Sequence, residues 1–303
     1  MSDEETNAIE EFSDALSYFL SIFGIILDLP CVIFLLNEFR CPKSLLRSSY
    51  FVILTVGLVT TVLVFIVRIV LLYDYSLEQQ FWEDVIITIF QWVPENMLGC
   101  WVFILSCNRC TALVSPKWHS KIWAQTPTTF IIIFLCLFPF MINGHYWFDS
   151  ECRFTSYIES CLEFRFQHTL ITSIANVFFG IASFIFIIAA VLYSKKQFTN
   201  LTPISAKVER RLIIQTFVSS LFLIAFSITV TISTTVTHEF KTFLILDNLG
   251  NVLFCLHHYP GMIILFFVSP VFRERCMEFY RINTILKFLS SKRKIVRIQQ
   301  HAS

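Results

Sequence analysis

The chain has 303 residues, of which 55% are hydrophobic and 15% are charged, and its mean hydropathy is +0.67. An average soluble domain carries about 25% charged residues, so this composition excludes an ordinary soluble domain and places the chain in a lipid bilayer. The net charge of +1 argues against a nucleic-acid-binding protein.

Seven apolar segments follow one another along the chain, and each is long enough to cross a bilayer as a helix of about 20 residues. They cover residues 15–37, 50–72, 84–107, 128–147, 169–193, 212–236 and 243–268. We therefore predict an all-α membrane protein built as a bundle of seven transmembrane helices.

The segments outside these helices complete the predicted organisation. Residues 1–14 are expected to form an extracellular segment, residues 15–268 the membrane domain, and residues 269–303 a cytoplasmic amphipathic helix followed by a basic tail. The leading segment is acidic and contains no lysine or arginine, whereas a secretory signal begins with basic residues. The first apolar segment is therefore expected to be a retained helix and not a cleaved leader.

The basic residues predict the orientation, because cytoplasmic segments next to membrane helices are rich in lysine and arginine. Of the 23 basic residues, 19 lie at or after the ends of the first, third, fifth and seventh apolar segments. Three lie on the opposite side, namely Arg153, Arg165 and Lys241. This distribution places the N-terminus outside the cell and the C-terminus in the cytoplasm.

A group of motifs begins at the end of the third apolar segment. Asn108-Arg109 is followed by Pro116 and then by Ile122-Trp123. Their order and spacing resemble those of nematode serpentine chemoreceptors, in particular class gamma (Srg) and the relatives in its superfamily. Further similarity lies in Arg47-Ser48-Ser49-Tyr50-Phe51, Gln91-Trp92-Val93-Pro94, Glu209-Arg210-Arg211-Leu212 and residues 269–273.

The resemblance implies a G-protein-coupled receptor that binds a small external chemical and signals to a heterotrimeric G protein. It also implies a multi-pass protein of the plasma membrane, in sensory cilia, and allows a dimer. A seven-helix channel or carrier is the alternative that topology alone leaves open. No catalytic or phosphate-binding motif is present, which argues against an enzyme, and no cofactor is implied.

Five polar side chains are predicted to line a ligand cavity in the outer half of the bundle, since ionisable groups inside a membrane usually mark functional sites. They are Arg68, Gln91, Glu95, Asp247 and Asn251, with Glu95 placed about half way across the third segment. The alternative is that Arg68 pairs with Glu95 or Asp247 and merely holds helices together.

Arg109 is predicted to be the switch for G-protein coupling. Asn108 stands where rhodopsin-like receptors have an acid, so Glu209 at the start of the sixth segment is the best candidate partner. We expect this pair to be partly solvated at the inner membrane boundary. The alternative is that Arg109 binds lipid phosphate or water.

The ten cysteines divide into different environments. Cys152 and Cys161 share an extracellular segment, where disulfides persist, and are predicted to form a disulfide. No set of Cys and His residues has the spacing of a metal site. The adjacent His257 and His258 are expected to make hydrogen bonds between helices, and Cys276 is either palmitoylated or a free thiol.

The predicted orientation has a direct test. An epitope tag at Met1 should be reachable by antibody on intact cells, and a tag at Ser303 should be reachable only after permeabilisation, because the basic segments stay in the cytoplasm. Immunofluorescence of the two tagged proteins, with and without detergent, gives the answer. The reverse labelling pattern would point to an inverted seven-helix channel.

Overall fold

The described part of the chain is helical throughout, apart from short turns. The computed structural model describes residues 3–42, 44, 46–73, 81–144, 162–197, 203–236 and 240–282, with the side chains of most of them. The helices in chain order are α1 (Asp3–Arg40), α2 (Ser49–Tyr73), α3 (Phe81–Val114), α4 (Pro116–Ile122), α5 (Gln125–Asn143), α6 (Leu162–Gln197), α7 (Pro203–Thr235), α8 (Phe240–Val268) and α9 (Pro270–Phe279).

Seven of these helices are long and apolar enough to cross a membrane, which confirms the predicted seven-helix bundle. Helices suit this environment because they satisfy their own backbone hydrogen bonds where water is absent. The membrane-spanning stretches are Ala15–Arg40, Ser49–Ile69, Trp92–Val114, Gln125–Asn143, Phe166–Tyr193, Ile213–Thr235 and Ile245–Val268.

The apolar stretch Trp92–Val114 lies in the same helix as the predicted third span, residues 84–107. Helix α3 has 34 residues, whereas about 20 suffice to cross the bilayer. Its length therefore does not determine which part is embedded. Glu95 lies near the middle of α3, and Arg109 lies five residues before its last residue, Val114.

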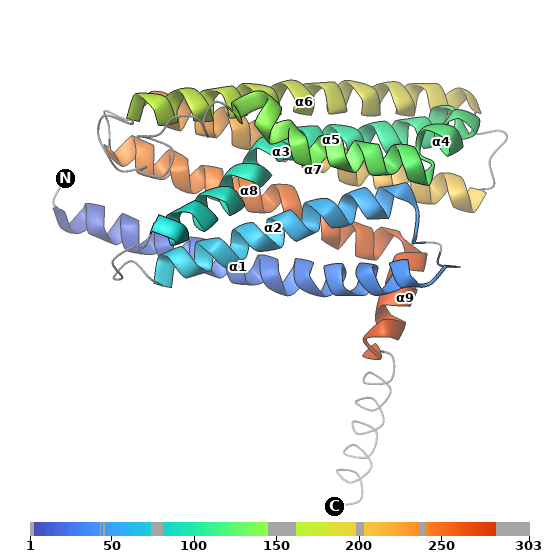
Figure 1. Ribbon diagram of the computed structural model, residues 1–303, viewed down its shortest axis with the longest axis horizontal. Coiled ribbons are helices and arrows are strands. Elements are labelled where there is room, and N and C mark those ends of the chain that lie inside the picture. Colours follow the sequence, from blue (N-terminus) through green and yellow to red (C-terminus); the bar gives the residue numbers. More distant parts are fainter. Residues whose placement is uncertain are drawn as a thin grey trace, which may run out of the picture.

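The spanning helices run side by side along the long axis of the molecule (Figure 1). Helix α7 packs extensively against α8, and α6 packs against both α3 and α7. Helix α3 also contacts α2, α5 and α7, so it occupies the centre of the bundle. Its position makes α3 the element that can connect the two ends of the molecule.

Large apolar side chains cover the outside of the bundle. Phe130, Phe178 and Phe267 are 67%, 65% and 67% exposed. In water such surfaces would favour aggregation, but lipid chains cover them at no hydrophobic cost. The exposed aromatic surface therefore agrees with a membrane-embedded bundle.

Helix α9 turns steeply away from the bundle at the end where α1 finishes (Figure 1). Its Phe272 is fully buried and its ring lies 5.4 Å from that of Phe34 and 6.0 Å from that of Phe51. The Tyr280 hydroxyl, just beyond the helix, donates a hydrogen bond of 2.6 Å to the carbonyl of Pro30. These contacts attach α9 firmly to α1 and α2.

Cys276 belongs to this attachment. Its side chain is 7% exposed and packs into the aromatic core, and burial raises the pKa of its thiol. The thiolate is the form that reacts in acylation and alkylation, so a buried thiol with a raised pKa reacts poorly. Of the two alternatives, the structure favours an unmodified thiol.

Candidate functional site

Arg109 lies near the cytoplasmic end of α3 and is only 6% exposed. Its guanidinium carbon sits 3.4 Å from the centre of the Tyr50 ring in α2, a cation–π contact. The Tyr50 hydroxyl donates a hydrogen bond of 3.3 Å to the Oε1 of Gln215 in α7. Arg109 is therefore buried, which corrects the expectation of a partly solvated residue, and its contacts link α3, α2 and α7.

The residues around Arg109 explain the spacing of the sequence motif. Asn108 donates from Nδ2 to the Ser49 hydroxyl oxygen at 2.9 Å, which attaches the end of α3 to α2. Trp123, after α4, donates from its ring N–H to the Thr111 hydroxyl oxygen at 2.7 Å. The Asn-Arg pair and the distant Trp therefore hold the same end of α3 from two sides.

The predicted partner Glu209 lies in α7, six residues before Gln215. Its side chain falls outside the described residues, as do Cys152 and Cys161. The Arg109–Glu209 pair and the Cys152–Cys161 disulfide therefore stay predictions. Tyr50 is the contact that sequence reasoning missed, because an aromatic ring opposite an arginine leaves no mark in charge patterning.

Three of the predicted ligand residues, Arg68, Asp247 and Asn251, lie toward the end of α2 and the start of α8. The Arg68 guanidinium lies over the Phe254 ring at 4.9 Å, which brings α2 against α8. One turn from Phe254, Asn251 donates from Nδ2 to an Asp247 carboxylate oxygen at 3.3 Å. These contacts place Arg68 beside the turn of α8 that carries Asn251.

The other members of the predicted set are placed differently. Glu95 is half-buried on α3, whereas the Asp247 side chain is exposed. The side chain of Gln91 lies outside the described residues. A single cavity shared by all five side chains therefore stays a prediction.

A buried polar cluster joins α3, α5 and α6 and was not predicted. The Asn143 amide group donates to Asn96 Oδ1 at 2.7 Å and to the Thr172 hydroxyl oxygen at 2.8 Å. Thr172 also contacts Asn96 Oδ1 at 2.8 Å. All three side chains are buried. The sequence signal for this cluster is the presence of polar residues inside apolar segments, but the predicted site does not include these three uncharged side chains.

Asn176 of α6 inserts its side chain at a weak point of α3. It donates from Nδ2 to the Glu95 carbonyl at 3.2 Å and accepts from the Gly99 backbone N–H at 2.8 Å. In an undisturbed helix the N–H of residue 99 bonds the carbonyl of residue 95, and Pro94 stands beside this position. The Asn176 carboxamide therefore binds the Glu95 carbonyl and the Gly99 N–H at a point where Pro94 and Gly99 weaken the helix.

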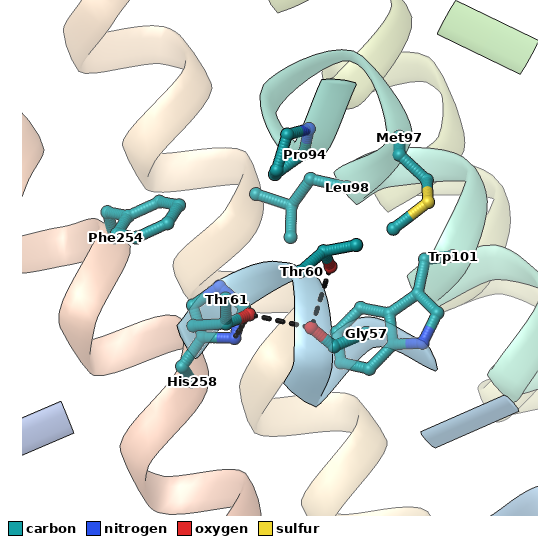
Figure 2. Close-up of a pocket in the computed structure, with 9 residues that line it drawn as sticks. All are labelled: Gly57, Thr60, Thr61, Pro94, Met97, Leu98, Trp101, Phe254 and His258. Atoms are coloured by element: carbon teal, nitrogen blue, oxygen red, sulfur yellow. Dashed lines mark hydrogen bonds between the residues drawn. The ribbon is translucent and has the colours of Figure 1, made fainter. Parts of the chain in front are cut away.

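Two narrow cavities lie inside the bundle and share the side chains of Trp101 and His258. We call the cavity shown in Figure 2 the outer cavity and the other one the inner cavity. The volume open to the centre of a water molecule is about 10 Å³ in the outer cavity and about 30 Å³ in the inner cavity. These spaces suit about one and two waters. Trp101 approaches α2 closely because Gly57 has no side chain; a Cβ at this position would lie 2.1 Å from the Trp101 ring. Of the predicted ligand residues, the four whose side chains the structure describes, Arg68, Glu95, Asp247 and Asn251, do not line either cavity.

Comparison with known proteins gives two findings. The family model described as "Serpentine type 7TM GPCR chemoreceptor Srx" matches residues 18–268. The protein "Serpentine receptor class XA 10" of Caenorhabditis elegans is 24% identical over an alignment of 234 residues that covers 65% of this chain and 67% of that protein. The family match covers the helices that carry Arg109 and Tyr50.

The close approach of α3 to α6 predicts the effect of a small substitution. In Gly99→Ala the new Cβ would lie 2.6 Å from Asn176 Oδ1 and 2.8 Å from the Asn176 Cα, and a backbone atom cannot move aside. We expect a loss of about 1–3 kcal/mol in stability, seen as a lower apparent melting temperature of the purified receptor.

Gly250→Ala is the matched control, because its Cβ would meet only Val230 at an ordinary distance of 3.4 Å. Equal melting temperatures for the two variants would show that α3 and α6 do not touch at Gly99.

Proposed function

The chain belongs to the Srx family of serpentine seven-transmembrane chemoreceptors, and we propose that it activates its G protein by releasing Arg109 from the ring of Tyr50. The predicted nematode serpentine chemoreceptor of the Srg superfamily is confirmed, and within that superfamily the class is Srx. It is a G-protein-coupled receptor and not an enzyme.

The contact of Arg109 with Tyr50 carries this proposal. A cation–π contact contributes about 0.5–2 kcal/mol, which is small enough for one binding event to shift the balance between two states. The same tyrosine donates to Gln215 on α7. Movement of α7 would therefore pull on Tyr50 and free the guanidinium for a G-protein contact at the cytoplasmic end.

Glu209 forms the second part of the proposed switch. It lies near the start of α7, on the segment whose movement would expose Arg109. When α7 moves outward, the carboxylate of Glu209 would leave the guanidinium at the same time as Gln215 leaves Tyr50. In the resting state, before this movement, the two contacts would together hold α7 against α2 and α3.

The ligand half of the proposal keeps the five predicted residues, Arg68, Gln91, Glu95, Asp247 and Asn251. The contact of Arg68 with Phe254 and the Asp247–Asn251 hydrogen bond support a shared outer site between α2 and α8. The proposed ligand is a small external chemical that reaches the receptor at the plasma membrane of sensory cilia. The proposed Cys152–Cys161 disulfide would cross-link the extracellular segment between α5 and α6.

Substitution of Tyr50 tests the switch. Tyr50→Leu removes the aromatic ring and should raise basal nucleotide exchange on a co-purified G protein by about threefold to tenfold, which corresponds to a loss of about 1 kcal/mol. Tyr50→Phe keeps the ring and removes only the hydroxyl, so it should give a smaller increase. Arg109→Ala should abolish exchange in either background.

Surface expression of each variant, measured by antibody on intact cells, controls for folding. Basal exchange that is the same in Tyr50→Leu and in the unmodified receptor, at equal expression, would rule out the ring as the resting contact of Arg109. Glu209→Gln, measured in the same assay, should also raise basal exchange if the carboxylate takes part.

Glu95→Gln tests the ligand half. It keeps the volume and the hydrogen-bonding groups of the side chain but removes its charge, and loss of one charged hydrogen bond costs about 1.5–3 kcal/mol. The dose–response curve for an activating small-molecule fraction should therefore shift by at least about tenfold. A curve that coincides with that of the unmodified receptor would make Glu95 a packing residue.

A further inference from the structure

The inner cavity lies between α2, α3, α7 and α8, about half way along the bundle. His257, His258, Gln215 and Gly261 are among the residues that line it. The two histidine side chains are 1% and 6% exposed. Two imidazoles beside one internal cavity raise the question of what their ring nitrogens bind.

His257 is held in one tautomer by the backbone of α7. Its Nδ1 lies 2.7 Å from the carbonyl oxygen of Ser219, and a carbonyl oxygen only accepts hydrogen bonds. Nδ1 must therefore carry the proton and donate it. In a neutral imidazole the other nitrogen, Nε2, is then a bare acceptor.

His258 reaches the same state through Thr61 of α2. The Thr61 hydroxyl lies 2.9 Å from the Gly57 carbonyl oxygen, and when it donates its one proton there it acts as the acceptor toward His258. The His258 Nδ1 lies 3.3 Å from that hydroxyl oxygen, and Figure 2 shows the two side chains together. In this arrangement Nδ1 donates to the hydroxyl oxygen. Its Nε2 is therefore also a bare acceptor.

Neither Nε2 has a hydrogen-bond partner within the described part of the chain. A buried acceptor without a donor is unfavourable because it has lost its hydrogen bonds to water, and here two such acceptors on neighbouring residues line one cavity. Gln215, whose Oε1 accepts from Tyr50, lines the same cavity. The site therefore has acceptors fixed by the fold and space beside them.

We propose that the inner cavity is a binding site for a small hydrogen-bond donor, held by the Nε2 atoms of His257 and His258. The space of about 30 Å³ for the centre of a water-sized molecule limits the occupant to about two waters or to one donor group of similar size. A hydroxyl or ammonium group of a small external molecule has the same chemistry as water. The proposal does not depend on the switch at Arg109, although Gln215 is common to both.

Solid-state NMR on receptor labelled with ¹⁵N-histidine in lipid bilayers tests the site directly. Magnetisation transferred from water protons should reach the Nε2 signals of His257 and His258 in the receptor without added ligand. His257→Asn and His258→Asn assign the two signals, because asparagine retains a donor in place of Nδ1 and removes the Nε2 acceptor. A second sample with ¹³C-methylammonium in deuterated buffer detects a donor other than water.

Gly261→Ala supplies the variant that fills the site. Its Cβ would enter the cavity at 3.4 Å from the Ser219 hydroxyl oxygen and 3.5 Å from Gln215 Nε2, which are ordinary contacts. A methyl group takes about the space of one water, so transfer to both histidines should fall by about half or more. Gly250→Ala, on the same helix and outside the cavity, should leave it unchanged.

Each result bears on the proposal. Transfer from water, or a contact with methylammonium, that falls in Gly261→Ala but not in Gly250→Ala supports a donor site and identifies its source. Histidine Nε2 signals that show neither contact in the unmodified receptor overturn the proposal, and so does a signal that Gly261→Ala leaves unchanged. If Gly261→Ala does not fold, the transfer measured in the unmodified receptor decides between these outcomes by itself.

Discussion

The buried guanidinium of Arg109 is the constraint on which the cytoplasmic half of the receptor depends. A charge inside a membrane span is costly unless it has close contacts, and the face of the Tyr50 ring supplies one at 3.4 Å. The hydroxyl of the same tyrosine reaches Gln215, so a single cation brings three helices together. Asn108 and Trp123 hold the same end of α3. A displacement of Arg109 would therefore disturb the contacts of the whole cytoplasmic end.

Helix α3 contributes residues to both the outer and the cytoplasmic half of the receptor, in order along its length. Glu95 lies near its middle, Gly99 marks the point where Asn176 binds its backbone, Trp101 borders both cavities, and Arg109 lies near its end. The polar groups that stabilise this path are uncharged amides, hydroxyls and imidazoles, which avoid the cost of burying charge. The outer and inner ends of the receptor thus share one helix, which Pro94 and Gly99 weaken near its middle.

The sequence predicts the seven helices well because each apolar segment is long and bounded by polar residues. It does not determine which part of α3 is embedded, since α3 is longer than the bilayer requires. It identifies Arg109 by its motif but not its partner Tyr50, because a ring 59 positions earlier meets the arginine only after α2 and α3 pack. The hydrogen bonds of His257 and His258 between helices are expected and found, whereas the cavity beside them depends on Gly261 and Gln215 coming together.

The most direct measurement is an experimental structure of the receptor alone and in complex with its G protein. The account predicts that the Arg109 guanidinium lies on the Tyr50 ring in the receptor alone, with the tyrosine hydroxyl bonded to Gln215. In the complex it predicts that α7 has moved outward, that the bond to Gln215 is broken and that the guanidinium contacts the G protein. An Arg109 that keeps its place on Tyr50 in both structures would contradict the proposed switch.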